Sequence, residues 1–230
     1  MNRDKLVNGI QFLKRSDFIG QVAFHEAGHA AAIYLRNRQK HLPQIYFHIS
    51  LSGFNQQKRQ SDAVRHESQG IFQAMLEGGL LQIQSLDMPD NEDCQSLECS
   101  TCHAAYEADV INLLAGPLAE ARHVALRDGE QINHHLVNLD ALKNYGGLSD
   151  MEKIEDYLNA YNCNPEKKME KLKHLYVTSF EFIAQPAHWR AITRLAHFIS
   201  TCGQELIRYE EAAEILDGNR KVAECLSCGR

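Results

Sequence analysis

The chain has 230 residues, 44% of them hydrophobic, which is enough to bury one large core or two small ones. Its formal net charge is −6 and the basic residues are scattered, so the sequence does not indicate a nucleic-acid-binding surface. No apolar run approaches the roughly 18 to 20 residues needed to span a bilayer. The opening segment lacks the apolar core of a signal peptide, so we expect a cytoplasmic protein with no membrane span.

The first predicted element is a helix over residues 17–37, where apolar residues recur at three-to-four spacing. Residues 44–51 alternate apolar and polar side chains and predict a strand. Residues 53–69 are polar and predict an exposed loop. The apolar segment 70–86 is compatible with a strand or a short helix, and residues 87–102 predict an acidic, cysteine-bearing loop.

Helical periodicity returns over residues 103–127, where we expect Pro117 to kink or restart the helix. Ser149 followed by Glu152 is a capping-box pattern and predicts a helix that begins at Asp150. Two or three further helices are predicted over residues 165–218. The sequence therefore predicts a mostly helical α+β fold with a small sheet near the first strand.

Residues 24–30, FHEAGHA, place His25 and His29 four residues apart on one face of the first helix, with Glu26 beside His25. Two imidazoles in this arrangement can share a zinc ion, and the glutamate can act as a general base. The alternative is an alanine-rich packing helix with incidental histidines. A zinc hydrolase needs a third protein ligand, and later helices offer these candidates: Glu120, His123 and Asp150.

Four stretches, in order, resemble the peptidase domain of the FtsH-type zinc proteases. VAFHEAGHA resembles the zinc helix of that family, VINLLAGPLAEA a later helix, GGLSDMEKI the segment that supplies the third ligand, and residues 191–216 the closing helices. The resemblance implies that His25, His29 and Asp150 bind Zn²⁺ and that Glu26 is the catalytic base. Glu120 is the main competitor for the role of third ligand.

The resemblance also implies a zincin-like fold in a single metallopeptidase-like domain, residues 1–230, with C-terminal helices over 166–217. Two features depart from the family pattern: Pro117 stands where a basic residue is expected, and residues 53–102 form an insertion. No Gly-Lys pair occurs, so the phosphate-binding loop of an ATP-driven unfolding module is missing.

The expected function is a zinc-dependent metalloendopeptidase that hydrolyses peptide bonds in peptides or unfolded proteins. The alternative is a non-catalytic zinc-binding relative that binds peptides or a partner protein. Glu26 favours the enzyme, because a binding module needs no base beside the metal; Pro117 and the insertion favour the alternative. A separate unfoldase and a homo-oligomer are both compatible with either interpretation.

Two further expectations concern packing. Gly28 is costly in a helix interior, so we expect another backbone to approach it closely, most simply that of the helix carrying Gly116. The strand at residues 44–51 is expected to border the active-site cleft and to pair with an extended peptide.

Seven cysteines, an odd number, suit a reducing compartment better than a disulfide framework. Two CxxC pairs and one neighbouring cysteine resemble the halves of a structural metal site. Reduced thiols in two loops are the interpretation we favour, because nothing in the sequence shows that the halves meet. A second metal therefore stays an open question for these residues: Cys94, Cys99, Cys102, Cys225 and Cys228.

Overall fold

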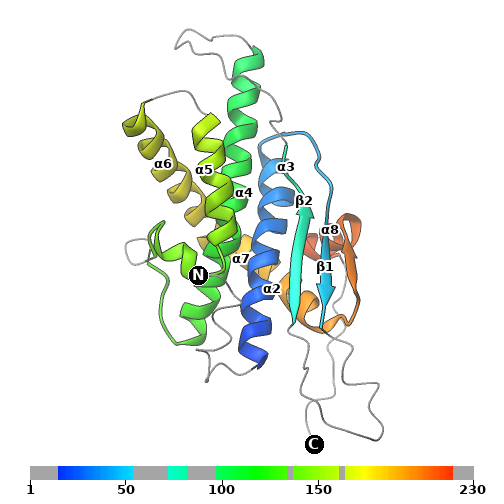
Figure 1. Ribbon diagram of the computed structural model, residues 1–230. Coiled ribbons are helices and arrows are strands. Elements are labelled where there is room, and N and C mark those ends of the chain that lie inside the picture. Colours follow the sequence, from blue (N-terminus) through cyan, green and yellow to red (C-terminus); the bar gives the residue numbers. More distant parts are fainter. Residues whose placement is uncertain (1–14, 54–71, 82–96, 134–136, 161–163, 220–230) are drawn as a thin grey trace, which may run out of the picture.

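The computed structural model describes residues 15–53, 72–81, 97–133, 137–160 and 164–219. Within these ranges the chain is mostly helical, with a three-stranded antiparallel sheet at one side (Figure 1). This arrangement confirms the expected α+β fold class. None of the helices in these ranges is both long enough and apolar enough to cross a membrane.

The first helix is confirmed. Helix α2 spans Arg15–Ala31 and continues without a break through a π-helical turn, η1 (Ala32–Arg36), into α3 (Asn37–Gln39). Its small residues allow close helix packing: Ala23, Ala27 and Ala30 are all fully buried. The helix is therefore buried along much of its length.

The sheet has the strand order β2-β1-β3. Strand β1 (Phe47–Ser52) confirms the predicted alternation, because Phe47, Ile49 and Leu51 are buried and the side chains between them are not. The ambiguous segment at 70–86 contains β2 (Gln73–Gly78), which pairs along the whole of β1 although it lies in the expected insertion. Strand β3 (Leu206–Arg208) was missed, because three residues are too few to show a period of two.

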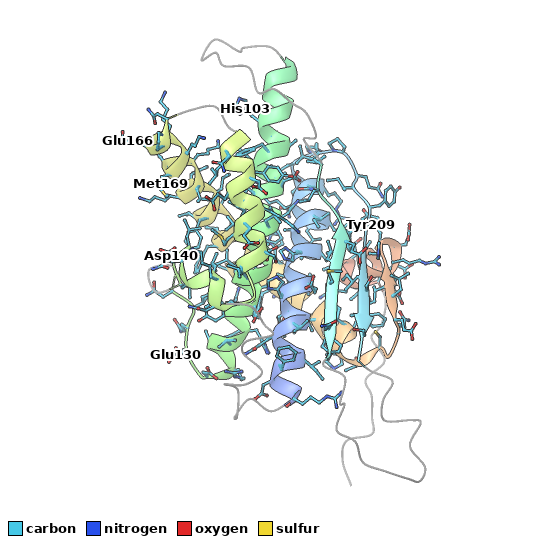
Figure 2. The ribbon with its side chains drawn as sticks, in the orientation of Figure 1. His103, Glu130, Asp140, Glu166, Met169 and Tyr209 are labelled. Carbon is cyan, nitrogen blue, oxygen red and sulfur yellow. The ribbon has the colours of Figure 1, made fainter. Side chains whose placement is uncertain are left out.

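Helix α4 (Leu97–Arg127) runs through the centre of the molecule. His103, near its start, and Glu130, just past its end, lie at opposite ends of the structure (Figure 2). The prediction of a loop up to residue 102 was wrong at its end, because residues 97–102 already belong to this helix. Pro117 does not restart the helix, which continues as one α-helix across it.

The remaining helices confirm the predicted C-terminal part. Helix α5 begins at Leu148 rather than Asp150, so Ser149 lies inside its first turn and not at the predicted cap. The Asn164 side chain caps the next helix by accepting a hydrogen bond from Lys167 N at 2.8 Å. The elements are η3 (Ala141–Asn144), α5 (Leu148–Ala160), α6 (Pro165–Ala184), α7 (Pro186–Thr201) and α8 (Tyr209–Asp217).

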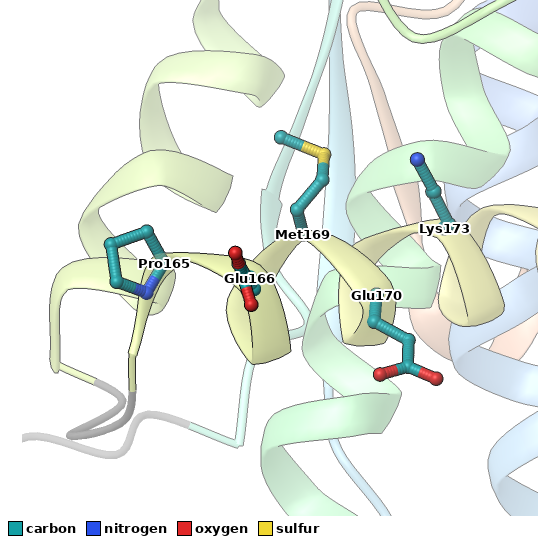
Figure 3. Close-up of a pocket in the computed structure, with 5 residues that line it drawn as sticks. All are labelled: Pro165, Glu166, Met169, Glu170 and Lys173. Carbon is teal, nitrogen blue, oxygen red and sulfur yellow. The ribbon is translucent and has the colours of Figure 1, made fainter.

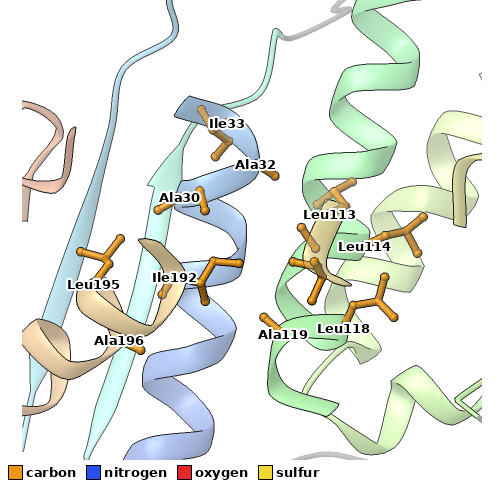
Figure 4. Close-up of a cluster of buried hydrophobic side chains, with 14 of the residues drawn as sticks. Ala30, Ala32, Ile33, Leu113, Leu114, Leu118, Ala119, Ile192, Leu195 and Ala196 are labelled. Carbon is orange, nitrogen blue, oxygen red and sulfur yellow. The ribbon is translucent and has the colours of Figure 1, made fainter. Parts of the chain in front are cut away.

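The core lies where α2, α4 and α7 meet. Strand β2 packs beside α2, α2 packs on α4, and α5 and α6 cover the other side of α4 (Figure 1). Figure 4 shows Ala30 of α2 beside larger side chains of α7, such as Ile192 and Leu195, whereas Leu114 and Leu118 of α4 point away from α2. Alanines on α2 let its backbone lie close to both neighbours, which fixes the position of every side chain that α2 carries.

Candidate metal centre

His25 and His29 lie one turn apart on α2 and are almost fully buried, at 4% and 8% exposed. Gly28 between them meets α4: a Cβ there would lie 2.5 Å from Ala115 O and 2.7 Å from Ala119 Cβ. This confirms the expected close approach. Gly116 is needed for a second reason, because any side chain at this position would overlap the imidazole of His29. Two glycines on facing helices thus make room for the site.

Asp150, in the first turn of α5, meets both histidines. His25 Nε2 and His29 Nε2 are 3.1 Å apart, Asp150 Oδ2 is 3.2 Å from His25 Nε2, and Asp150 Oδ1 is 3.5 Å from His29 Nε2. Four ligand atoms around a tetrahedral zinc ion, each about 2.0–2.1 Å from it, are about 3.3 Å from one another. The three separations fit ligands of one such ion. Within the described ranges, this is the group of His, Cys, Asp and Glu side chains that could hold a metal.

The Nδ1 atoms of both histidines face away from Asp150 toward acceptors. His25 Nδ1 is 3.0 Å from Glu120 Oε2 and 3.2 Å from Tyr145 O. His29 Nδ1 is 2.7 Å from Asn112 O. A carbonyl or carboxylate oxygen can only accept, so each Nδ1 carries the hydrogen and each Nε2 is left to bind a metal. Glu120 therefore stands behind His25 and not among the three converging groups.

Asp150 is buried, at 5% exposed, and within the described residues its Oδ2 makes no well-aligned hydrogen bond, although His25 Nε2 lies 3.2 Å away. Burial by itself would raise the pKa of this carboxyl, but the imidazoles of His29 and His25 hold it low, at about 2. An ionised, buried carboxylate needs a positively charged partner, and in the metal-free chain the His25 imidazole, 3.2 Å from Oδ2, can supply that charge. The donor set and this oxygen together fit a zinc ion.

The two imidazoles differ in their protonation. Burial opposes a charge on His25, yet the carboxylates of Asp150 and Glu120 raise the pKa of His25 to about 10. Burial lowers the pKa of His29, and the neighbouring His25 lowers it further. The metal-free chain thus favours one positive charge between the imidazoles and Asp150, a charge that a metal ion can supply in place of the proton.

Glu26 lies beside this group, 7% exposed, and its Oε2 accepts a hydrogen bond of 2.8 Å from Leu76 N of β2. Leu76 is opposite Ile49 in the sheet, and its N–H points away from β1. The strand that borders the site is therefore β2, which lies at the edge. The expectation that β1 would do so was wrong, because β1 is the central strand and both of its edges are paired.

Pro117, the departure from the family pattern, contacts the segment that leads to Asp150. A Cβ at Gly147 would lie 2.8 Å from Pro117 Cβ and 3.0 Å from Pro117 Cγ, so the ring lies directly against Gly147. Helix α5 begins one residue later. The proline of α4 therefore helps to set where α5 starts.

Other candidates lie elsewhere. His123, offered by the sequence as a third ligand, stacks on Phe24 with ring centroids 4.1 Å apart. Cys94, Cys225 and Cys228 lie outside the described residues. Cys99 and Cys102 lie on α4, with their side chains outside the part of the chain that the structure describes. The pocket in Figure 3 is lined by residues of α6 alone and includes no residue of the metal centre.

The sequence pointed to the side chains of this centre but not to its backbone groups. Asn112 O, Tyr145 O and Leu76 N each contact a site residue through the main chain, where residue type carries no signal. Comparison of the chain with protein-family models, curated proteins and solved structures finds no match. The likeness to the FtsH-type peptidases therefore stands on the sequence motifs alone.

Proposed function

We propose that this chain is a zinc-dependent metallopeptidase that hydrolyses peptide bonds in peptides or unfolded polypeptides. One observation carries the proposal: His25, His29 and Asp150 converge from two helices with the carboxylate of Glu26 alongside. Two imidazoles and one carboxylate form a ligand set that, in catalytic zinc sites, leaves a position for water. The resemblance of the motifs to those of FtsH-type peptidases supports the same assignment.

When bound, zinc would supply a Lewis acid for the substrate carbonyl and lower the pKa of a water molecule. Glu26 is placed to take a proton from the attacking water and to return it to the leaving amine. Its Oε2 is held by Leu76 N, which fixes the direction of the carboxylate. Glu120 and Asn112 O hold the two imidazoles in the orientation that leaves both Nε2 atoms available.

The edge of β2 supports a peptide as the substrate. Ala74, Leu76 and Gly78 occupy alternate positions of this strand, so their backbone groups share the side that faces away from β1. An extended peptide can pair with such an edge through its main chain, without regard to side chains. Unfolded or short peptides are the appropriate substrates, because a strand edge pairs with an extended chain.

A non-catalytic zinc-binding protein that holds peptides or a partner is the second candidate. The burial of the site favours it, since His25, Glu26, His29 and Asp150 are each between 4% and 8% exposed. The hydrogen bond from Leu76 N also engages the general base. A closed site of this kind would have to open at β2 before a substrate could reach Glu26.

Comparison of wild type with Glu26→Gln distinguishes the peptidase from the non-catalytic zinc-binding protein. Glu26→Gln keeps the shape and hydrogen bonding of the side chain but removes the base, so it should retain zinc and lose hydrolysis of casein and of fluorogenic peptide libraries. Glu155→Gln, at an exposed position of α5, is the matched control and should behave as wild type. If zinc-loaded wild type cleaves no better than Glu26→Gln, the non-catalytic candidate is correct.

A further inference from the structure

Asp109 is a fully buried carboxylate on α4, with 0% of its surface exposed. It shares one face of this helix with Asn112, Gly116 and Glu120, because the four residues are spaced by three or four positions. The other three all touch His25 or His29. Asp109 lies two turns before Gly116, about 10 Å along the helix, and so continues the same face beyond the metal centre.

The Asp109 carboxylate joins α4 to two other elements. Leu81 N, just beyond the end of β2, donates to both oxygens, at 2.9 Å and 3.1 Å. Tyr157 OH of α5 donates to Oδ2 at 2.8 Å. Tyr157 lies two turns after Asp150 on the same helix. One buried side chain therefore connects the edge strand to the helix that carries the third candidate ligand.

Strand β2 runs along α2 between two acidic contacts. Leu76 N meets Glu26, Gly79 lies against Ile33, and Leu81 N meets Asp109. From Leu76 to Gly79 an extended chain advances about 10 Å, and from Glu26 to Ile33 a helix also advances about 10 Å. The strand therefore runs alongside the helix over this length. Glu26, the candidate base, bonds the strand at Leu76, and Asp109 bonds the chain just past its end at Leu81.

We propose that Asp109 is a positioning residue: it clamps the exit of β2 to α4 and α5, and so keeps the peptide-binding edge aligned with the metal centre. The inference rests on the proposed function for its effect on substrate, but not for its effect on the strand. Strand β2 ends at Gly78 and Gly79 N still pairs with Tyr46 O, so among the described residues Leu81 N lies past the strand pairing and is held by Asp109. Loss of the clamp should loosen the edge without moving His25, His29 or Asp150.

The charge of Asp109 supports this role. Burial raises the pKa of Asp109 to about 6, while the hydrogen bonds from Leu81 and Tyr157 work in the opposite direction. Tyr157 is the titratable group that faces Asp109 from α5, and the pKa of Tyr157 is raised by burial and by Asp109. From the end of β2, the backbone amide of Leu81 faces Asp109. Hydrogen bonds to a charged acceptor are stronger than those to a neutral one, so the hold on Leu81 should weaken as pH falls below about 6 while the carboxyl stays buried. Burial has the opposite effect on the fold as a whole, which is more stable with Asp109 protonated.

The test uses the full chain loaded with zinc and three variants. Asp109→Asn is isosteric and uncharged, Tyr157→Phe removes one donor and keeps the ring, and Asp156→Asn is the matched control at an exposed position of α5. Amide hydrogen exchange at Leu76 and Leu81 reports on the strand directly. Zinc affinity reports on the metal ligands. For a peptide substrate, KM reports on binding at the edge of β2, and kcat reports on the hydrolysis step.

We expect Asp109→Asn to lower the protection of the Leu81 amide about tenfold and to raise the peptide KM by a similar factor, the effect of losing one charge-assisted hydrogen bond. Tyr157→Phe should do the same to a smaller extent. Zinc affinity and kcat should stay within about threefold, a range too small for a lost ligand. In wild type, protection at Leu81 should fall between pH 7.5 and 5, whereas in Asp109→Asn it should not change.

Unchanged protection at Leu81 in Asp109→Asn, or an equal change in Asp156→Asn, would overturn the inference. A loss of zinc that parallels the loss of protection would also overturn it, because it would show a general structural role. If no protein in the series hydrolyses peptides, the proposed function fails, and the exchange and zinc measurements still decide whether Asp109 holds the strand.

Discussion

The ring of Pro117 on α4 lies against Gly147, the residue immediately before helix α5. A side chain at Gly147 would also meet Leu142 O, at 2.8 Å from its Cβ, so this glycine is enclosed on two sides. Asp150 lies in the first turn of α5, three residues after Gly147, so the contact between Pro117 and Gly147 lies next to the segment that carries Asp150. Pro117, which departs from the pattern of the FtsH-type motifs, thus packs against the segment that leads to the candidate metal centre.

Gly147→Ala should weaken zinc binding by about 5- to 150-fold, because the added methyl group must push α5 away from α4 and overpacking of this kind costs about 1–3 kcal/mol. The backbone at Gly147 does not have a positive φ, so the substitution tests space alone. Competition titration with a chromophoric chelator measures the affinity. Ser149→Ala, at an exposed position beside Asp150, is the control and should bind zinc as wild type.

Asp150 and Glu120 should respond differently to substitution. Asp150→Ala removes a proposed ligand and should abolish stoichiometric zinc binding at micromolar metal. Glu120→Gln removes the charge behind His25 and should lower zinc affinity by about 10- to 100-fold, the usual effect of losing a carboxylate that orients a ligating histidine. Metal content after dialysis, together with the titration, separates the two. The reverse order of effects would mean that Glu120 is the ligand.

Gly28→Ala should destabilise the fold although alanine is the better helix former. The helix preference favours the variant by about 1 kcal/mol. The new Cβ, however, would lie 2.5 Å from Ala115 O, a backbone atom that cannot move alone. We expect a net loss of about 1–2 kcal/mol in the free energy of unfolding. Urea denaturation of the metal-free protein measures it, and Ala104→Gly, at an exposed site of α4, calibrates the preference term. A more stable Gly28→Ala would disprove the close contact.

The stability of the metal-free protein should depend on pH through Asp109. Its pKa in the folded state is about 6, above the ordinary value of 3.8, so the folded state binds this proton more tightly than the unfolded state does. The stabilisation from this proton is complete below about pH 4 and is lost as pH rises through about 6. Relative to Asp109→Asn, wild type should gain about 2 kcal/mol between pH 7 and pH 4. A difference that stays constant with pH would show that Asp109 has an ordinary pKa.

Several parts of the fold could be predicted because their signals are local. The helix at residues 17–37 and the alternation of Phe47, Ile49 and Leu51 arise from which face of each element is buried, and this appears in the sequence as a period. The start of α4 could not be predicted, because residues 97–102 lack a clear apolar stripe. Strand β3 is only three residues long, so its pairing with β1 determines it rather than its own pattern.

The same division holds for the candidate site. The spacing of His25 and His29 determined by itself that the two imidazoles would lie together, because helix geometry places positions four apart on one face. The sequence could not choose between Asp150 and Glu120 from spacing, since both lie on distant helices. Only tertiary packing decided that Asp150 faces the Nε2 atoms, that Glu120 stands behind His25, and that β2 rather than β1 forms the edge, because these relations depend on how α4, α5 and the sheet lie against α2.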